Sequence, residues 1–323
     1  RWTLRGDVRG LALNPAEPIP GLRGLDARFE ASAEGAQLDI AGEGVRVELP
    51  WLLARDAPLS FDRLAARVGL ARDDGGLRIE ADDLELENAD LRLRSRLAVD
   101  FPADGRGPSL DLSGDIRVDD AGAIRRYVPA TLLKPKLRRW LDQAFLAGRV
   151  PSGRFLFRGR PADFPFADGQ GRFEAALRVQ DLDLRFNARW PHFESVDGVL
   201  RFAIARLEID ATAGRLLDLS VRDAELVIPD VRDARAILVE GSAIGAFGDA
   251  VAFLARSPLK ERLGAIPERF EVTGMARIDL SMSVPLRRRG PEDRLGLDGA
   301  LSWPGPASLA PSWTCLLYTS PSP

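Results

Sequence analysis

Apolar and polar residues alternate along most of this chain with a period of two. One early run carries its apolar residues at Leu25, Ala27, Phe29 and Ala31. Similar runs recur over residues 91–99, 110–118 and 173–179. A period of two places every second side chain on the same face of an extended strand, so the pattern predicts many half-buried β-strands.

Two local features interrupt this alternation. The run Asp73-Asp74-Gly75-Gly76 separates two alternating segments, and Asp and Gly both tolerate positive φ, so we expect a hairpin turn there. After Val179 the apolar positions change parity and continue at Leu182 and Leu184. A change of parity within a strand predicts a turn or a bulge near residues 180–181.

A helical insert is expected over residues 119–148. Its apolar residues follow the spacing of one helix stripe: Leu137, Trp140, Leu141, Ala144 and Phe145. Pro135 suits the first turn and Gly148 the residue after the last, while Asp119 or Asp120 can cap a short helix over residues 121–126.

A second helix is expected to span Ser242 to Arg256, where the apolar residues again form one stripe. A long alternating strand follows, from Phe270 to Val284. The expected domains are therefore a β segment over 1–118, the helical insert over 119–148, and a β segment over 149–305. Residues 306–323 depart from the pattern and have the character of a non-native, adaptor-derived tail.

Roughly sixteen to eighteen strands of this kind fit a sandwich, a closed barrel or an open sheet. A closed core of that size needs bulky side chains to fill it, and aromatic residues make up only 7% of the chain. We therefore predict a mainly β protein, with a long, twisted, curled antiparallel sheet whose apolar face forms an open groove. Lipid acyl chains would fill such a groove, at about 0.8 kcal/mol for each buried CH₂.

Charge and composition limit the classes of function that this chain can have. The formal net charge of −3 gives no basis for nucleic-acid binding, and the single Cys315 excludes an internal disulfide framework. Neither a signal peptide nor an apolar run of about 18 residues is present. The chain starts at Arg1 rather than Met, which favours an internal fragment.

Catalytic and metal-binding residues are not expected. His192 is the only histidine, so a catalytic triad or a multi-histidine metal site is excluded in most forms. The paired acids Asp73-Asp74 and Asp119-Asp120 could suggest glycoside hydrolysis, but adjacent residues of a strand point to opposite faces and both pairs suit turns or caps. The expectation is a protein that is not an enzyme and holds no cofactor.

Residues 127–202 resemble a known family. The matching positions are Tyr127-Val128-Pro129, Arg139-Trp140-Leu141, Gly148, Phe157-Arg158-Gly159, Asp163-Phe164-Pro165-Phe166, Trp190-Pro191 and Val196-Asp197-Gly198-Val199-Leu200-Arg201-Phe202. This run is similar to the YhdP-like group of the AsmA-like family, which is related to TamB and belongs to the Gram-negative envelope. The resemblance implies a repeating β-groove in the periplasm, held at the inner membrane by an N-terminal helix that this chain lacks, and it carries over no catalytic residue.

The resulting prediction is a segment of a conduit that moves phospholipid between the inner and outer membranes, with acyl chains sliding in the groove. Envelope proteins are possible partners, and nucleic acid is not expected. The candidate groove-lining residues are Phe155, Phe157, Phe173, Ala175, Leu177, Leu182, Leu184, Phe270, Val272, Ile278, Leu280 and Met282. The alternatives are a structural or assembly scaffold of the envelope, in which the same residues fill a closed core, and a carbohydrate-active β-protein.

Overall fold

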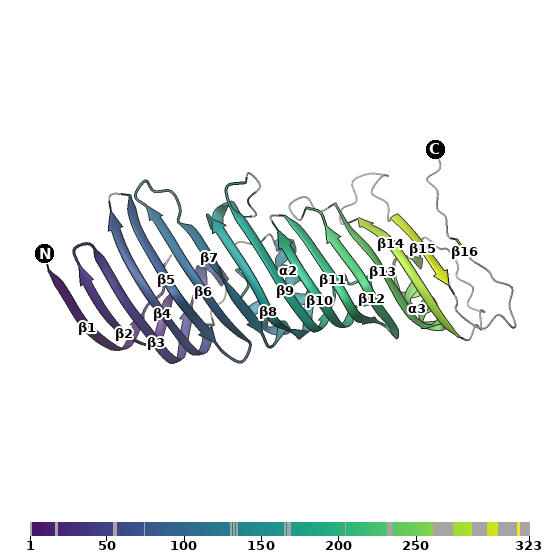
Figure 1. Cartoon of the computed structure of the whole chain (residues 1–323), viewed down its shortest axis with the longest axis horizontal. Helices are drawn as coiled ribbons and strands as arrows, with labels where there is room; N and C mark the ends of the chain where they lie inside the picture. The colour runs from purple at the N-terminus through teal and green to yellow at the C-terminus, as the bar shows by residue number, and fades with distance from the viewer. Residues whose placement is uncertain are drawn as a thin grey trace. The chain divides into compact units, whose positions relative to one another are not determined.

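The computed structural model of the chain is built almost entirely of β-strands joined by short connections (Figure 1). It describes residues 2–16, 19–53, 57–73, 75–129, 131, 133, 135–164, 166, 169–203, 205–230, 235–260, 274–285, 296–302 and 315–316. The hydrogen-bonded order of the strands is the same as their order in the chain, and the sheet does not close on itself. The expected mainly β fold with an open antiparallel sheet is confirmed.

The strands are longer than those of most compact domains, in which about five or six residues are usual. The first eight are β1 (Thr3–Leu13), β2 (Gly21–Ser32), β3 (Gly35–Glu48), β4 (Leu59–Asp73), β5 (Gly76–Glu87), β6 (Leu91–Pro102), β7 (Ser109–Val118) and β8 (Phe145–Gly159). The others are β9 (Arg172–Leu184), β10 (Phe193–Ala203), β11 (Arg206–Leu216), β12 (Leu219–Ile228), β13 (Ala236–Ala246), β14 (Met275–Pro285), β15 (Gly296–Ser302) and β16 (Cys315–Leu316).

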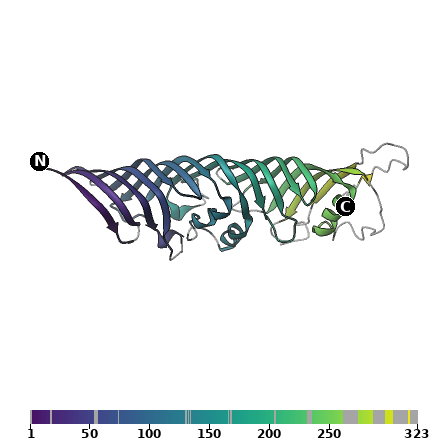
Figure 2. The same cartoon turned by 90° about the horizontal axis from the view of Figure 1, so that it is seen from below.

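The helices are short and lie in the connections between strands. They are α1 (Pro50–Leu53), the 3-10 helix η1 (Ala121–Arg126), α2 (Pro135–Ala144), the 3-10 helix η2 (Pro161–Asp163) and α3 (Phe247–Arg256). Figure 2 shows α3, in green, beside the strands of the C-terminal part of the chain.

The chain forms two compact units. The first contains residues 1–142 and 149–177, and the second contains residues 143–148 and 178–323. In the first unit, β1 through β8 pair antiparallel, each with the next. In the second, β10 through β16 do the same.

Several of these strands contain a bulge at which one residue adopts a positive φ. In the first unit these residues include Gly10, Gly24, Gly44 and Asp83, and in the second Asp181, Ser195 and Asp223. Nearly all of them fall at breaks in the register of the paired strands. The parity change after Val179 is explained in this way, because Asp181 has a φ of 52° within β9. A bulge bends its strand, and the parity change keeps the apolar side chains on one face on both sides of the bend.

Two neighbouring bulges of the second unit hold each other. The backbone N–H of Asp181 donates to Asp197 Oδ1, and the N–H of Ser195 donates to Asp183 Oδ1, each at 2.9 Å. In the first unit, the N–H of Gly10 donates to Asp26 Oδ1 at the same distance. A carboxylate on the next strand therefore satisfies the N–H that a bulge removes from the ladder.

The face opposite the apolar one carries rows of alternating charge. In the first unit one row crosses five strands, through Asp7, Arg28, Asp39, Arg67 and Asp82. The Arg28–Asp7 and Arg67–Asp39 pairs are 3.0 and 3.1 Å apart. All these groups are exposed, so each pair contributes little on its own, and their main effect is to keep like charges from facing each other.

The structure confirms two of the expected turns and corrects two helix boundaries. The turn at Asp73–Gly76 joins β4 to β5, and the Asp120 side chain caps η1 by accepting from the N–H of Gly122. The helix expected to end at Gly148 ends at Ala144. Gly148 has a φ of 116°, and a Cβ there would lie 2.6 Å from Leu182 Cα, so this glycine permits a close approach to β9 rather than ending a helix.

The helix expected within residues 242–256 begins at Phe247. Residues 242–246 continue β13 and pair with the start of β14, where Ser242 faces Asp279 and Ala246 faces Met275. Backbone pairing with β14 therefore outweighs the helical spacing of the apolar residues there. The strand expected from Phe270 is described from Met275 onward.

We expect Asp183→Ala and Asp197→Ala each to lower the free energy of unfolding by about 1 kcal/mol, because each leaves the N–H of a bulge without its charged acceptor. Asp210→Ala is the matched control, since it removes only an exposed ion pair with Arg201 and should change stability by less than about 0.5 kcal/mol. Urea unfolding of the three variants measures the difference, and equal losses in all three would contradict the role of the bulges.

Candidate functional site

Apolar side chains form continuous rows across the strands of the first unit. The register aligns one row from β2 to β8, through Phe29, Leu38, Val68, Ala81, Leu97, Leu112 and Phe157. A second row runs from β3 to β7, through Ala36, Leu70, Ile79, Val99 and Leu110. These rows carry no charged residue, and they lie on the face opposite the charged rows.

The apolar face of the first unit is divided lengthwise into two stripes. One stripe follows the strand ends that lead into α1 and η1, and its side chains are buried; it contains Leu25, Val45, Phe61, Leu64, Leu91, Val118 and Val150. The other follows the strand ends joined by short turns at 33–34 and 74–75, and its side chains are only half buried; it contains Phe29, Leu38, Val68, Leu97, Leu112 and Phe157. We call these the covered stripe and the open stripe.

Protein segments account for the covered stripe. Tyr127, just after η1, lies on Phe61 with ring centroids 6.4 Å apart. Thr131 Oγ1 donates to the carbonyl of Leu52 in α1 at 3.0 Å, which joins two of the connections above the sheet. Leu53 of α1 and Ala121 of η1 are themselves buried. This half of the face therefore belongs to the hydrophobic core.

Polar contacts fasten the connection after η1 to the β5–β6 turn. The Tyr127 hydroxyl donates to Asp90 Oδ2 at 2.7 Å and accepts from Asn88 Nδ2 at 2.8 Å. Arg126 contacts the same carboxylate at 2.8 Å. Burial, and next the hydrogen bond to the Asp90 carboxylate, raise the pKa of Tyr127 from 10.0 to about 12.

The second unit repeats the division into stripes. Its open stripe crosses β10 to β13 through Leu200, Ile209, Leu226 and Val239, which are half buried and occupy one row. Its covered stripe contains Leu216, Leu219, Val221 and Ile278, which are buried beneath Phe253 of α3 and Trp190 of the β9–β10 connection. The rings of Trp190 and Phe253 are 6.2 Å apart.

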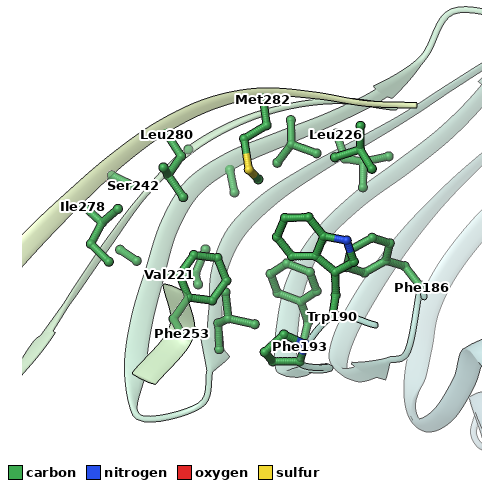
Figure 3. Close-up of a pocket in the computed structure, with 17 residues that line it drawn as sticks. Phe186, Trp190, Phe193, Val221, Leu226, Ser242, Phe253, Ile278, Leu280 and Met282 are labelled. Atoms are coloured by element: carbon green, nitrogen blue, oxygen red, sulfur yellow. The ribbon is translucent and has the colours of Figure 1, made fainter. Parts of the chain in front are cut away.

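A pocket lies where these two stripes of the second unit meet (Figure 3). It is open to solvent, and none of the described residues that line it is charged. Leu226, Val239 and Met282 come from the open side, and Trp190, Phe193 and Phe253 from the covered side. Ser242 is the one polar side chain among the lining residues. Such a surface can bind hydrocarbon and offers nothing that would hold a charged ligand.

The predicted lining residues fall into three groups. Half-buried positions on the apolar face are held by Phe155, Phe157, Phe173, Ala175 and Leu177 in the first unit, and by Leu280 in the second. Leu182, Leu184, Ile278 and Met282 are buried, and the last two line the pocket together with Leu280. Phe270 and Val272 lie outside the described residues. That any of these residues binds lipid remains a prediction.

The sequence reasoning missed the residues that close the pocket. Trp190 and Phe253 were not proposed as lining residues, although each occurs beside a helix or a turn that could have been expected to fold over the sheet. Leu226 lies on β12 and Val239 on β13, and only the register shows that they share a row with Met282.

The described part of the chain holds no group of three or more metal-ligating side chains. His192 Nε2 lies 3.0 Å from Glu194 Oε1, and Arg215 also contacts Glu194, at 2.6 Å. Asp73 ends β4 within its turn, and Asp119 pairs with Arg117 at 3.1 Å. Asp119 and Asp120 therefore have pairing and capping roles, and Asp74 lies outside the described residues. Among the described helices, none has the length and apolar content needed to cross a membrane.

An open antiparallel sheet with one charged face and one apolar face, partly uncovered, defines the class of β-groove proteins. Within that class the chain belongs to the YhdP protein family, whose model matches residues 1–297. The chain is 22% identical over 273 residues to the intermembrane phospholipid transporter YhdP of Escherichia coli (strain K12). That alignment covers 83% of this chain and 21% of the relative, so the chain spans about a fifth of the relative's length. No solved structure matches the chain.

Replacing Tyr127 by Phe should lower the free energy of unfolding at neutral pH by about 1 kcal/mol, because Asp90 and Asn88 lose a partner. The pKa of Tyr127 is higher in the folded state, so its contribution is complete below pH 10 and is lost as the pH rises toward about 12. Over that interval the parent should lose stability more steeply than the variant. Parallel slopes for the two proteins in pH-dependent thermal unfolding would contradict this assignment.

Proposed function

We propose that this chain is a segment of a lipid conduit that carries phospholipid between the inner and outer membranes of a Gram-negative cell. Acyl chains lie on the open stripe of each unit and slide along it, while the headgroups stay in water. The observation that carries the proposal is the open stripe itself, whose rows of apolar side chains are mostly only half buried within the part of the chain that the structure describes.

Several properties of the open stripe support an acyl chain as the occupant. Its rows run from strand to strand without a charged side chain, so a hydrocarbon can move along them without meeting a position that favours water. Each CH₂ that leaves water contributes about 0.8 kcal/mol wherever it lies on such a surface. An acyl chain that moves along the row exchanges one set of apolar contacts for an equivalent set. No large free-energy barrier therefore opposes its sliding.

The proposed mechanism requires no chemical step, and we propose that the chain is not an enzyme. The relative is named a transporter, which agrees with this. We further place the chain in the periplasm, as part of a protein held at the inner membrane, because a conduit between two membranes must lie between them. Headgroup preference and direction of movement are not part of the proposal.

A closed scaffold is the second candidate, and the core of the second unit favours it. There Phe253 and Trp190 cover the sheet face, and Phe253 and Leu219 are almost fully buried. If the same packing extended over the open stripe in solution, the apolar face would hold the protein together and would bind no lipid. The two candidates differ in whether phospholipid occupies the open stripe.

We expect Leu226→Glu to reduce the phospholipid that remains bound to the purified chain by about tenfold or more, because a carboxylate in the open stripe loses its hydration when an acyl chain covers it. Ser220→Glu is the matched control, since it adds the same charge to β12 at an exposed position. The measurement is mass spectrometry of organic extracts after incubation with vesicles of phosphatidylethanolamine and phosphatidylglycerol.

Circular dichroism of both variants establishes that the sheet is retained. Equal amounts of lipid in the two variants would contradict a lipid path through Leu226. The absence of phospholipid from the parent chain would favour the scaffold.

A further inference from the structure

One connection on the open side of the first unit differs from the others. On that side β2 and β3 are joined by a tight turn at residues 33–34, and β6 and β7 by residues 103–108, whereas the longer run 160–171 joins β8 and β9. We call residues 160–164 together with Phe166 the strap. It contains η2 and places two aromatic side chains, Phe164 and Phe166, on the apolar face.

The strap lies over the open stripe at Phe157. The Phe164 ring stacks on Phe157 at 6.2 Å and meets Phe173 edge-on at 5.9 Å. The Phe166 ring is 5.2 Å from Phe157. Phe157 is the β8 member of the row that crosses β2 to β8, so these two rings occupy the place where an acyl chain on that row would have to lie.

The sheet is shaped to receive Phe166. A Cβ at Gly159 would lie 2.8 Å from the Phe166 ring, and one at Gly171 would lie 2.2 Å from it. Two glycines therefore leave the space that the ring fills. Phe166 is only 3% exposed and adopts a φ of 58°, an unfavourable backbone conformation for a phenylalanine that its burial offsets.

Two hydrogen bonds among the described residues lie within the strap itself. Arg160 Nε donates to Asp163 Oδ2 at 2.7 Å, and the N–H of Phe166 donates to the carbonyl of Asp163 at 2.7 Å. Asp163 thus joins both ends of the strap. A segment fastened by its own hydrogen bonds can lift from the face as one piece when its aromatic rings leave their places on the sheet.

We propose that the strap is a gate in the acyl path: its aromatic rings occlude the open stripe at β8 and β9, and lipid passes this point only when the strap lifts. The inference rests on the proposed function, because a gate has meaning only if acyl chains use the open stripe. The gate adds that lipid movement along the first unit is interrupted at one defined position. The contacts of Phe164 and Asp163 determine how often the strap leaves that position open.

The test places a photoreactive phenylalanine analogue at one of three positions in the full chain. Position 157 lies beneath the strap, position 97 lies in the same row away from it, and position 176 is exposed on β9 and reports background. Each protein is irradiated with vesicles of tritium-labelled phosphatidylethanolamine and phosphatidylglycerol, and labelled protein is counted.

The parent should capture lipid at position 97, whereas at position 157 it should capture mainly its own strap. Phe164→Ala should raise lipid capture at 157 by about tenfold and leave capture at 97 unchanged, because it removes the ring that contacts Phe157, Phe166 and Phe173. Asp163→Asn loosens the strap without removing a ring, so it should raise capture at 157 by a smaller factor. This second variant keeps the test decisive if Phe164→Ala does not fold.

Asp111→Asn is the control for Asp163→Asn, because it breaks an arginine–carboxylate pair of similar length, 2.8 Å to Arg158, on the charged face. It should change capture at neither position. Equal capture at 157 and 97 in the parent, or no rise at 157 in either strap variant, would overturn the gate while leaving the conduit intact. Capture at background level at position 97 would instead overturn the proposed function, and the gate with it.

Discussion

The β-bulge is the constraint on which the rest of this structure depends. Strands of ten to fifteen residues must keep their apolar side chains on one face while the sheet bends. A residue with positive φ near the middle of a strand meets both requirements. It bends the strand, and it moves the following side chains by one position, so that the apolar ones stay on the same face. The cost is a backbone N–H without a ladder partner, and carboxylates such as Asp183 and Asp197 on the next strand supply the missing acceptor.

The bulges also mark the boundary between two environments. Toward the strand ends that carry helices, the connections fold back over the sheet and bury the apolar side chains, as Tyr127 does on Phe61 and Phe253 does in the second unit. Toward the other ends of the first unit, with the strap as an exception, the connections leave the same kind of side chain half exposed. A single strand such as β12 therefore contributes Leu219 to the core and Leu226 to the open stripe.

The sequence alone predicted the fold class, most strand positions, the turn at Asp73–Gly76 and the bulge near Asp181, because each depends on local residue chemistry and on a period of two. It did not predict the end of α2. A glycine is needed at position 148 because β9 approaches closely there, and β9 is a later strand that local spacing does not reveal. Nor could it separate the two stripes. Leu177 and Leu182 alternate in the same way, yet one is half buried and the other buried, and that difference depends on which connections lie above them.

The alternating charges of the outer face have a consequence for how such a sheet can grow. In the row from Asp7 to Asp82 each arginine lies between two carboxylates of adjacent strands, so the balance is local to each hairpin. A duplicated hairpin would bring its own neutral set of charges and its own segment of apolar row. Proteins built in this way can lengthen or shorten by two strands at a time without changing the charge balance of the sheet as a whole.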